Sequence, residues 1–334
     1  MASIADIAKK LNLSNSTVSR ALRDSGLVTK ETREKVLLAA QEVGYEVNVI
    51  ARKLRSGESK TIGVIVSDIT NLFHGEIITA IQKVAIDNGY TVIFGTSSED
   101  ENTERELIDL LKSNMLQGLI IVPTHQSINN IRPLAHLPIV EVDRLSGLDS
   151  SDQVLISNHE SMKLATNYLI SQGHRNILYC TGDLAITTFD ERLSGFKSAI
   201  AEADSNITHD VLLVKDTDKL QSRTSSEVIN FLTGKNRPSA IIAANDFIGE
   251  GVISAIYKCG LAVPEDISFL MFDDPRWASF FPTPLTVIKQ PAYQLGLTAA
   301  KLLISKIENK EKRTKSVKRL TADLIVRQSV AKVG

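Results

Sequence analysis

The sequence has few cysteines and no long apolar run. Cys180 and Cys259 are the only cysteines among 334 residues, and neither belongs to a C-x-x-C pair, which excludes a disulfide framework and a zinc knuckle. No segment has 18 consecutive apolar residues, and the first residues, MASIADIAKK, have no apolar core or small-residue cleavage site. We therefore expect neither a membrane-spanning helix nor an export signal, and we expect a protein of the reducing cytoplasm.

Patterns typical of enzymes and metal sites are also missing. The 6 histidines are scattered without an i,i+4 pair, and no P-loop or nucleophile elbow occurs. GEGVIS, at 249–254, imitates a dinucleotide fingerprint but falls inside a predicted helix, where glycines serve packing. Asp273 and Asp274 have no second acid at a spacing suited to hydrolysis. The sequence predicts no enzyme, no cofactor and no metal.

The charge of the chain is balanced overall but uneven along its length. The net charge is −1, whereas residues 1–60 hold 11 Lys and Arg against 7 Asp and Glu. A chain of this length is sufficient for two or three domains. Excess positive charge is therefore confined to the N-terminal part, and the rest has no general attraction for polyanions.

The first expected helix follows Ser3, which is suited to be its N-cap. Apolar side chains recur there at spacings of three and four, on one face of a helix: Ile4, Ile7, Ala8 and Leu11. Asn12 follows in the turn LNLS, and asparagine tolerates the left-handed backbone that a sharp reversal needs.

Ser14 is suited to cap a second helix, whose Val18 and Leu22 would pack against the first. The polar side chains of this helix would then face outward: Asn15, Ser16, Thr17, Ser19 and Arg20. Two helices joined by a tight turn, of which the second presents polar groups, form a helix-turn-helix.

A third helix is expected from Thr29 or Lys30 to Gly44, a glycine suited to a helix C-terminus. Its buried side would consist of Val36, Leu37, Ala40 and Val43. Three such helices close a small core that by itself needs no ligand. The short polar donors and the arginine of the second helix instead favour contacts with base edges and phosphates in a major groove.

From residue 60 onward, β-branched runs alternate with amphipathic stretches of helix length. The runs predict buried parallel strands: IGVIV, TVIFG, GLIIVP, PIVEVD, NILYC, AIIAA and ISFLMF. The intervening stretches predict helices near residues 75–88, 104–113, 159–172, 190–203, 220–233, 246–259 and 292–307. This is a doubly wound α/β pattern, in which two sheets with a cleft between them bind ligands at the carboxyl ends of their strands.

Residues directly after the predicted strands are therefore candidates for the cleft: Leu72, Phe73, Arg144, Asn245 and Asp273. Leu72 and Phe73 equally suit the core at a helix start, and Arg144 can pair with the preceding aspartate instead of a ligand. With Arg192, at the start of a predicted helix, an amide and a carboxylate would offer the donors and acceptors that vicinal hydroxyls need.

The sequence as a whole resembles the LacI/GalR family of repressors. Three N-terminal motifs carry the resemblance in order, IADIAKKLNLSNSTVSRAL, VTKETREKVLLAAQEVGY and NVIARKL, and six further motifs extend it: SDITNLF, VDR, ERLSGF, AND, FDD and LTVIKQP. The resemblance implies an all-α helix-turn-helix domain over residues 1–46 and a hinge helix or linker over 47–59. It also implies a two-lobe α/β core over 60–334, similar to periplasmic binding proteins, for effector binding and dimerisation.

In that family the second helix reads the major groove, and the hinge enters the minor groove, where a leucine wedges a base step. The implied DNA contacts are Ser3, Asn15, Ser16, Thr17, Ser19, Arg20, Asn48, Ala51, Arg52 and Leu54. Val47 stands where the family usually has proline, and a plain flexible linker is the alternative for the hinge.

The resemblance places the effector between the lobes, with contacts from Leu72, Phe73, Arg144, Arg192, Asn245, Asp273 and Trp277. Trp277 is suited either to stack on a sugar ring or to pack the hinge between the lobes. Met271 replaces the glycine common in that strand motif, and SNHES, near residue 159, lacks the usual acidic pair.

The expected function is control of carbohydrate-utilisation genes by a DNA-binding repressor whose effector is a small sugar or sugar phosphate. A regulator that responds to a purine, a nucleoside or another ligand is the alternative, followed by a stand-alone sugar-binding protein. A homodimer on a nearly palindromic operator is expected, because two half-sites lie about one helical turn apart. We expect no tetramer, since no leucine heptad follows LIVRQ.

Overall fold

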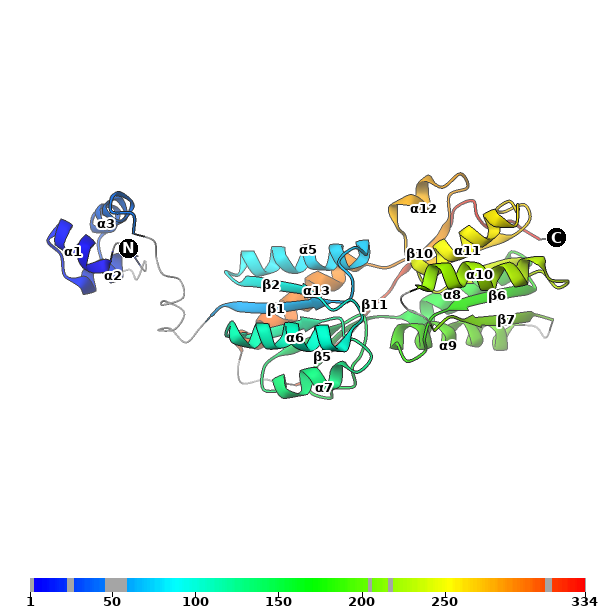
Figure 1. The fold of residues 1–334 in the computed structure, drawn as a ribbon, viewed down its shortest axis with the longest axis horizontal. Coiled ribbons are helices and arrows are strands. Elements are labelled where there is room, and N and C mark those ends of the chain that lie inside the picture. The colour runs from blue at the N-terminus through cyan, green and yellow to red at the C-terminus, as the bar shows by residue number, and fades with distance from the viewer. Residues whose placement is uncertain are drawn as a thin grey trace. The chain divides into compact units, whose positions relative to one another are not determined.

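The computed structural model describes residues 3–22, 27–45, 59–203, 206–215, 219–309 and 314–333. The contacts divide the chain into two compact units, Met1–Ser59 and Lys60–Gly334 (Figure 1). Each unit is considered by itself below.

Unit one contains the three predicted helices: α1 (Ile4–Leu11), α2 (Asn15–Leu22) and α3 (Lys30–Glu42). Ser3 and Asp6 form a reciprocal capping box at the start of α1, and Asn12 ends this helix with a φ of 53°. The Ser14 hydroxyl accepts a 3.1 Å hydrogen bond from the backbone N–H of Thr17. The caps predicted for α1 and α2 are therefore confirmed.

The core of unit one differs from the prediction at one position. Val18 and Val36 are fully buried as expected, but Leu37 is 42% exposed, and Ala39 is buried in its place. Residues 36, 39 and 40 share one face of α3 because they are three and four apart, whereas residue 37 lies about 100° around the helix from residue 36. The prediction for Leu37 was therefore wrong.

Unit two contains two sheets, each forming one lobe. The sheet of the N-lobe has the order β11-β5-β4-β3-β1-β2 and is parallel throughout. Its strands are β1 (Thr61–Val66), β2 (Thr91–Thr96), β3 (Gly118–Ile121), β4 (Ile139–Val142), β5 (Asp152–Ile156) and β11 (Val317–Leu320).

The sheet of the C-lobe has the order β12-β10-β9-β8-β6-β7, and only its edge strand β12 runs antiparallel to its neighbour. Its strands are β6 (Asn176–Thr181), β7 (Thr208–Leu213), β8 (Ala240–Ala243), β9 (Ser268–Phe272), β10 (Thr286–Lys289) and β12 (Asp323–Ile325). Strands β5, β7, β10 and β11 were not predicted, whereas β12 overlaps the strand-like segment LIVRQ. The edge strands β7 and β11 are mostly exposed and polar, so they lack the apolar run that marks a buried strand.

Helices cover both faces of each sheet (Figure 1). The N-lobe has α5 (Leu72–Asp87), α6 (Glu101–Ser113), α7 (Ser127–Ile131), the short 3₁₀ helix η1 (Arg132–Leu134) and α13 (Ala292–Glu308). The C-lobe has α8 (Asn158–Ser171), α9 (Thr187–Glu202), α10 (Leu220–Thr233), α11 (Asp246–Lys258) and α12 (Arg276–Phe280). The predicted two-lobe α/β fold class is confirmed.

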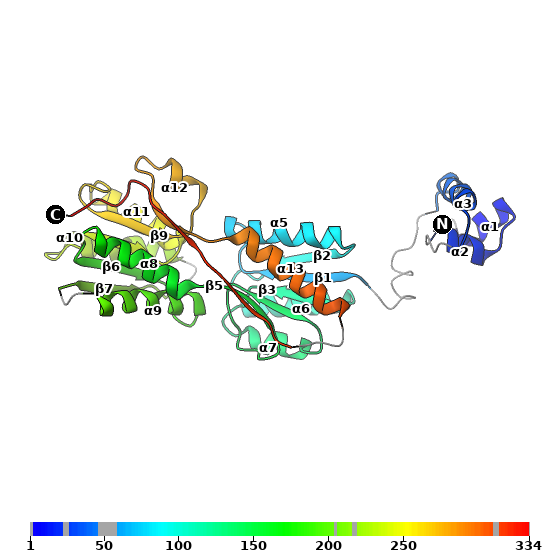
Figure 2. The same cartoon turned by 180° about the vertical axis from the view of Figure 1, so that it is seen from behind.

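Helix α13 comes late in the chain but packs in the N-lobe, beside α5 (Figure 2). The two helices approach closely at Gly296, where a Cβ atom would lie 2.4 Å from the carbonyl oxygen of Ile77. The chain therefore crosses between the lobes three times, at β5–α8, β10–α13 and β11–β12.

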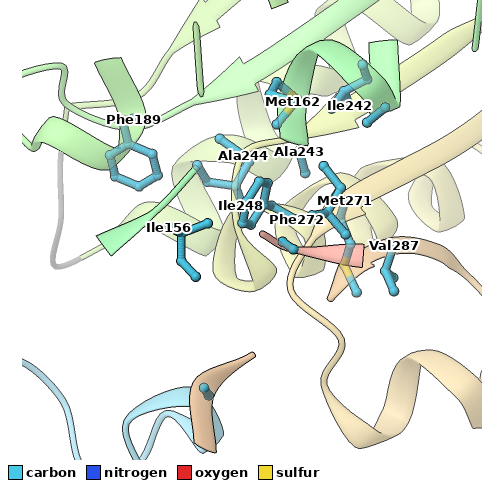
Figure 3. Close-up of a cluster of buried hydrophobic side chains, with 14 of the residues drawn as sticks. Ile156, Met162, Phe189, Ile242, Ala243, Ala244, Ile248, Met271, Phe272 and Val287 are labelled. Carbon is cyan, nitrogen blue, oxygen red and sulfur yellow. The ribbon is translucent and has the colours of Figure 1, made fainter. Parts of the chain in front are cut away.

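The core of the C-lobe surrounds β8 and β9 (Figure 3). Met271, which replaces the expected glycine, is fully buried beside Gly249 of α11, where a Cβ atom would lie 2.7 Å from the Met271 sulfur. A Cβ atom at Gly251 would lie 2.5 Å from the carbonyl oxygen of Gln221. The glycines of GEGVIS thus serve helix packing, as predicted. No helix in the described part of the chain is long and apolar enough to cross a bilayer.

Candidate functional site

The outward face of α2 carries the side chains predicted to contact DNA. Asn15, Ser16 and Arg20 are exposed, and Thr17 and Ser19 are half-buried. The Ser14 hydroxyl lies 2.8 Å from the hydroxyl oxygens of both Ser16 and Thr17. The N-terminal turn of α2 therefore presents a cluster of hydroxyls, which are suited to phosphates and base edges.

Ser3 is exposed, and its hydroxyl donates a 2.8 Å hydrogen bond to Asp6 within the capping box. Four further predicted DNA contacts lie outside the described residues: Asn48, Ala51, Arg52 and Leu54.

Unit two holds a cavity of about 450 Å³ at the carboxyl ends of its strands, between the lobes. Residues that directly follow β1, β4, β9 and β10 line it: Ser67, Asp143, Asp273 and Gln290. Five of the predicted effector contacts also line it: Phe73, Arg144, Arg192, Asn245 and Asp273. The site thus lies where the strand-end rule for doubly wound sheets places it.

Asp273 is held by contacts from the two segments beside it. One carboxylate oxygen accepts from the Gln290 amide at 2.5 Å, and the other accepts from the backbone N–H of Asp246 at 3.2 Å. Burial raises the pKa of Asp273. Burial, together with the charge of Asp273, raises the pKa of Asp246 to about 8. Two neighbouring acids with raised pKa values therefore line the cavity wall.

Arg192 extends from α9 into the floor of the cavity and is only 3% exposed. Its Nε donates to Asn158 Oδ1 at 2.8 Å, its Nη1 donates to the carbonyl of Ala244 at 2.7 Å, and its guanidinium carbon lies 3.6 Å from the ring centre of Phe272. The protein thus holds the guanidinium in place at the lining of the cavity.

On the N-lobe side, Arg144 donates through Nη1 to both carboxylate oxygens of Glu99, at 2.8 and 2.7 Å. Asp143 is 7% exposed, and its Oδ1 has no hydrogen-bond partner among the described residues. Burial raises the pKa of Asp143. A ligand that donates a hydrogen bond to this oxygen would relieve a buried unsatisfied acceptor.

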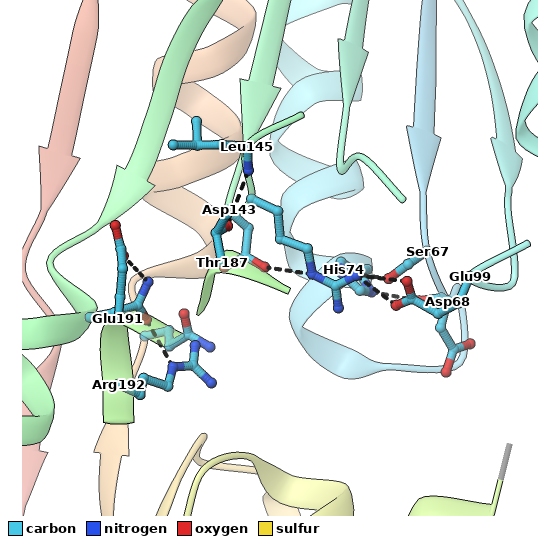
Figure 4. A network of polar contacts seen from close by, with 12 residues as sticks. Ser67, Asp68, His74, Glu99, Asp143, Leu145, Thr187, Glu191 and Arg192 are labelled. Carbon is cyan, nitrogen blue, oxygen red and sulfur yellow. Dashed lines mark hydrogen bonds and ion pairs between the residues drawn. The ribbon is translucent and has the colours of Figure 1, made fainter. Parts of the chain in front are cut away.

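His74 lies beside Ser67, Asp68 and Glu99 on the same side (Figure 4). Its Nδ1 lies 2.8 Å from the carbonyl oxygen of Asp68, and its Nε2 lies 3.5 Å from the Ser67 hydroxyl. Burial, followed by the charge of Arg144, lowers the pKa of His74. His74 is therefore neutral near pH 7.

Two predicted effector contacts are not among the residues that line the cavity. Leu72, the first residue of α5, lines a neighbouring hollow of about 50 Å³, which Phe73 also lines. Trp277 lies on α12, which starts after Pro275, and faces a separate apolar groove of the C-lobe with Phe281 and Tyr257. Contact of Leu72 and Trp277 with an effector stays a prediction.

Most of the residues that line the cavity were not predicted, among them Asp143, Asp246, Gln290 and Phe189. Asp143 and Asp246 each adjoin a predicted residue in the motifs VDR and AND, and Gln290 directly follows β10. These three residues also lie at or shortly after the carboxyl ends of strands, as the predicted residues do. Phe189 comes from within α9 and carries no such signal. The described residues contain no cluster of three or more groups suited to hold a metal ion.

Comparisons with known proteins decide the family. Residues 3–48 match the bacterial regulatory proteins of the lacI family, and residues 166–330 match a periplasmic binding protein-like domain. The HTH-type transcriptional repressor PurR of Vibrio vulnificus is 30% identical over 337 residues, which cover 100% of both chains. The chain belongs to the LacI family. It is a DNA-binding transcriptional repressor and not an enzyme.

Solved structures of the family agree in fold. A lac repressor dimer bound to operator and the anti-inducer ONPF has a TM-score of 0.83 and 24% identity, over 99% of both chains. A putative ribose operon repressor from Burkholderia thailandensis has a TM-score of 0.72 and 29% identity, over 80% of this chain and 99% of its own. A LacI family regulator from Enterococcus faecium with bound ribose has a TM-score of 0.71 and 26% identity, over 82% of this chain and 100% of its own. The family predicted from the sequence is confirmed.

Proposed function

We propose that this repressor acts in the cytoplasm on carbohydrate-utilisation genes and is controlled by a small neutral sugar in the cavity of unit two. One observation carries the proposal: Asp143, Asp246 and Asp273 meet in one cavity, and Asp143 Oδ1 has no partner among the described residues. Carboxylates accept hydrogen bonds, and the hydroxyls of a sugar donate them.

The charges of the lining favour a sugar over a sugar phosphate. Near pH 7 the raised pKa of Asp246 leaves this carboxyl mostly neutral, so four carboxylates line the cavity, from Asp68, Glu99, Asp143 and Asp273, against three cations, from Arg144, Arg192 and Lys219. Glu99 pairs with Arg144, and protein acceptors occupy two nitrogens of Arg192. A phosphate dianion would meet more negative than positive charge, and would lack the open guanidinium fork that such groups bind.

A purine or its nucleoside is the alternative effector. The relatives named PurR favour it, as do the rings of Phe73 and Phe189, which line the cavity from opposite lobes and are suited to a flat ligand. Solved relatives of similar identity include one with bound ribose. The carboxylates of the lining support the sugar, and the two phenyl rings support the purine.

Calorimetry with the full chain distinguishes these effectors. D-ribose, D-ribose 5-phosphate, guanine and guanosine serve as probes, followed by a wider panel of neutral and phosphorylated sugars. We expect saturable binding of a neutral sugar, and binding at least about tenfold weaker for its phosphorylated form. Preference for a phosphorylated sugar, or binding of guanine or guanosine alone, would contradict the neutral-sugar proposal.

On the DNA side, we propose that Asn15, Ser16 and Arg20 contact bases, and that Thr17 and Ser19 contact phosphates, with Ser3 beside the backbone. The proposed hinge contacts are Asn48, Ala51, Arg52 and the wedge Leu54. This assignment retains the division into a DNA-binding domain over 1–46, a hinge over 47–59 and an effector-binding and dimerisation domain over 60–334. Exposed polar residues on α2 support it.

We propose further that the repressor is a homodimer on a nearly palindromic operator, as expected from the spacing of half-sites. The apolar groove beside α11 and α12 supports an interface there. Tyr257 and Phe280 are each 84% exposed, next to Trp277 and Phe281. Aromatic side chains exposed together are typical of a surface covered by a partner.

A further inference from the structure

Where the chain first crosses between the lobes, after β5, a buried asparagine forms hydrogen bonds with two consecutive residues of α9. Asn158 is fully buried at the start of α8, two residues after the end of β5. Its Oδ1 accepts from Arg192 Nε at 2.8 Å, and its Nδ2 donates to Glu191 Oε2 at 3.0 Å. One amide group therefore hydrogen-bonds to two neighbouring side chains of α9, Glu191 and Arg192, which Figure 4 labels.

The two partners lead in different directions. Arg192 lines the cavity. Glu191 pairs with Arg319 of β11, a strand of the N-lobe, with its Oε1 3.0 Å from Arg319 Nη2. Arg319 Nη1 also donates at 3.1 Å to the carbonyl of Ile156, the last residue of β5. The Glu191–Arg319 ion pair thus spans the two lobes, close to two of the three crossings.

We propose that Asn158 and Glu191 are positioning residues that couple contact of an effector with Arg192 to the relative orientation of the two lobes. This proposal rests on the proposed control of operator binding by an effector in the cavity. It assigns a regulatory role to three residues that do not line the cavity: Asn158, Glu191 and Arg319.

The physical basis is that the Asn158 amide cannot turn toward one partner without leaving the other. A ligand that shifts the Arg192 guanidinium changes the position of Oδ1, and therefore the hydrogen bond from Nδ2 to Glu191. Glu191 in turn either holds Arg319 or releases it, and the lobe orientation with the pair formed gains or loses stability accordingly. A ligand changes a two-state equilibrium only through such differential contacts.

The test uses the full chain and a DNA duplex that the wild-type protein selects from a randomised pool. Glu191→Gln and Arg319→Gln each remove the ion pair between the lobes. Asn158→Asp keeps an acceptor for Arg192 but replaces the donor to Glu191 with a repelling carboxylate. Glu202→Gln is the matched control, since Glu202 is also on α9 but pairs with Lys163 of α8 within the C-lobe, at 2.7 Å.

The Glu191–Arg319 ion pair is partly exposed, so its loss should change the operator Kd only moderately. Glu191→Gln and Arg319→Gln should each shift the operator Kd in the same direction, by about two- to fivefold. The double variant should shift it no further, because both changes remove one interaction. Asn158→Asp should shift it in that direction too, and Glu202→Gln should leave it unchanged. Hydrogen–deuterium exchange at residues 155–158 should rise in Glu191→Gln but not in Glu202→Gln.

Glu191→Gln and Arg319→Gln variants that match Glu202→Gln in both measurements would overturn the proposal, and so would additive effects in the double variant. Failure of the proposed function has a different signature. In that case the operator affinity of the wild-type protein would respond to none of the sugars or purines, whatever the variants show.

Discussion

Asp143 and Asp273 occupy equivalent positions in the two lobes. Each directly follows a central strand, β4 or β9, and each has a positive φ, of 68° and 80°. Each also donates its backbone N–H to the next strand of its sheet, Asp143 to Val154 and Asp273 to Ile288. The same strained turn therefore presents one carboxylate from each lobe to the cavity between them.

Asp273→Asn is the first prediction. Asparagine tolerates the positive φ and keeps the shape of the side chain, so the loss is confined to an acceptor and a charge. An effector whose hydroxyls are matched by Asp273 should bind about ten- to a hundredfold more weakly, as measured by calorimetry. Operator binding without effector should persist, and Asp109→Asn on α6, whose side chain is 63% exposed, serves as the control. Wild-type effector affinity in Asp273→Asn would remove Asp273 from the site.

A second prediction concerns pH. The pKa of Asp246 is raised from 3.8 to about 8, so the folded protein holds this proton more tightly than the unfolded chain does. The stability from the protonated form is fully present below pH 3.8 and is lost as the pH rises to about 8. In Asp246→Asn, the fall in Tm between pH 5 and pH 8.5 should be smaller than in wild type, by about 2 °C or more. Equal falls in both proteins would show that Asp246 does not carry this proton.

Arg20→Ala tests the reading helix. Loss of a base contact should cost about 1 to 3 kcal/mol on the selected duplex and relax its sequence preference. The affinity of the wild-type protein should fall steeply with salt. Lys35→Ala on α3, where Lys35 pairs with Glu31 at 2.7 Å, is the matched loss of one positive charge in the same unit. Indistinguishable titrations for the two variants on every duplex would contradict base reading by Arg20.

Phe280→Glu tests the proposed dimer surface. A charge placed among aromatic side chains at a buried interface should raise the dimer dissociation constant by at least about tenfold, as measured by sedimentation. Leu164→Glu on α8 provides the control, since Leu164 is also an exposed apolar residue of the C-lobe, at 51%. A Phe280→Glu protein that dimerises as the wild type does would place the interface elsewhere.

Short sequence patterns predicted much of this architecture. Ser3, Asn12 and Ser14 mark helix ends because caps and left-handed turns depend on the residue and its immediate neighbours. Seven strands were predicted from their β-branched runs, β1, β2, β3, β4, β6, β8 and β9. The positions after predicted strands located the cavity with four of its lining residues, Phe73, Arg144, Asn245 and Asp273. These features depend on short stretches of chain, so a single sequence was sufficient to predict them.

Other features were decided only by tertiary structure. After β4 two neighbouring residues both line the cavity, Asp143 and Arg144, and Asp143 has a positive φ there. Trp277 lies on α12, the helix that begins after Pro275, and lines an apolar groove. No local sequence pattern predicts this placement. The bond from Asn158 to Glu191 joins residues 33 positions apart in the chain. Contacts of this kind depend on how helices and lobes pack against each other. No short stretch of the sequence predicts such packing.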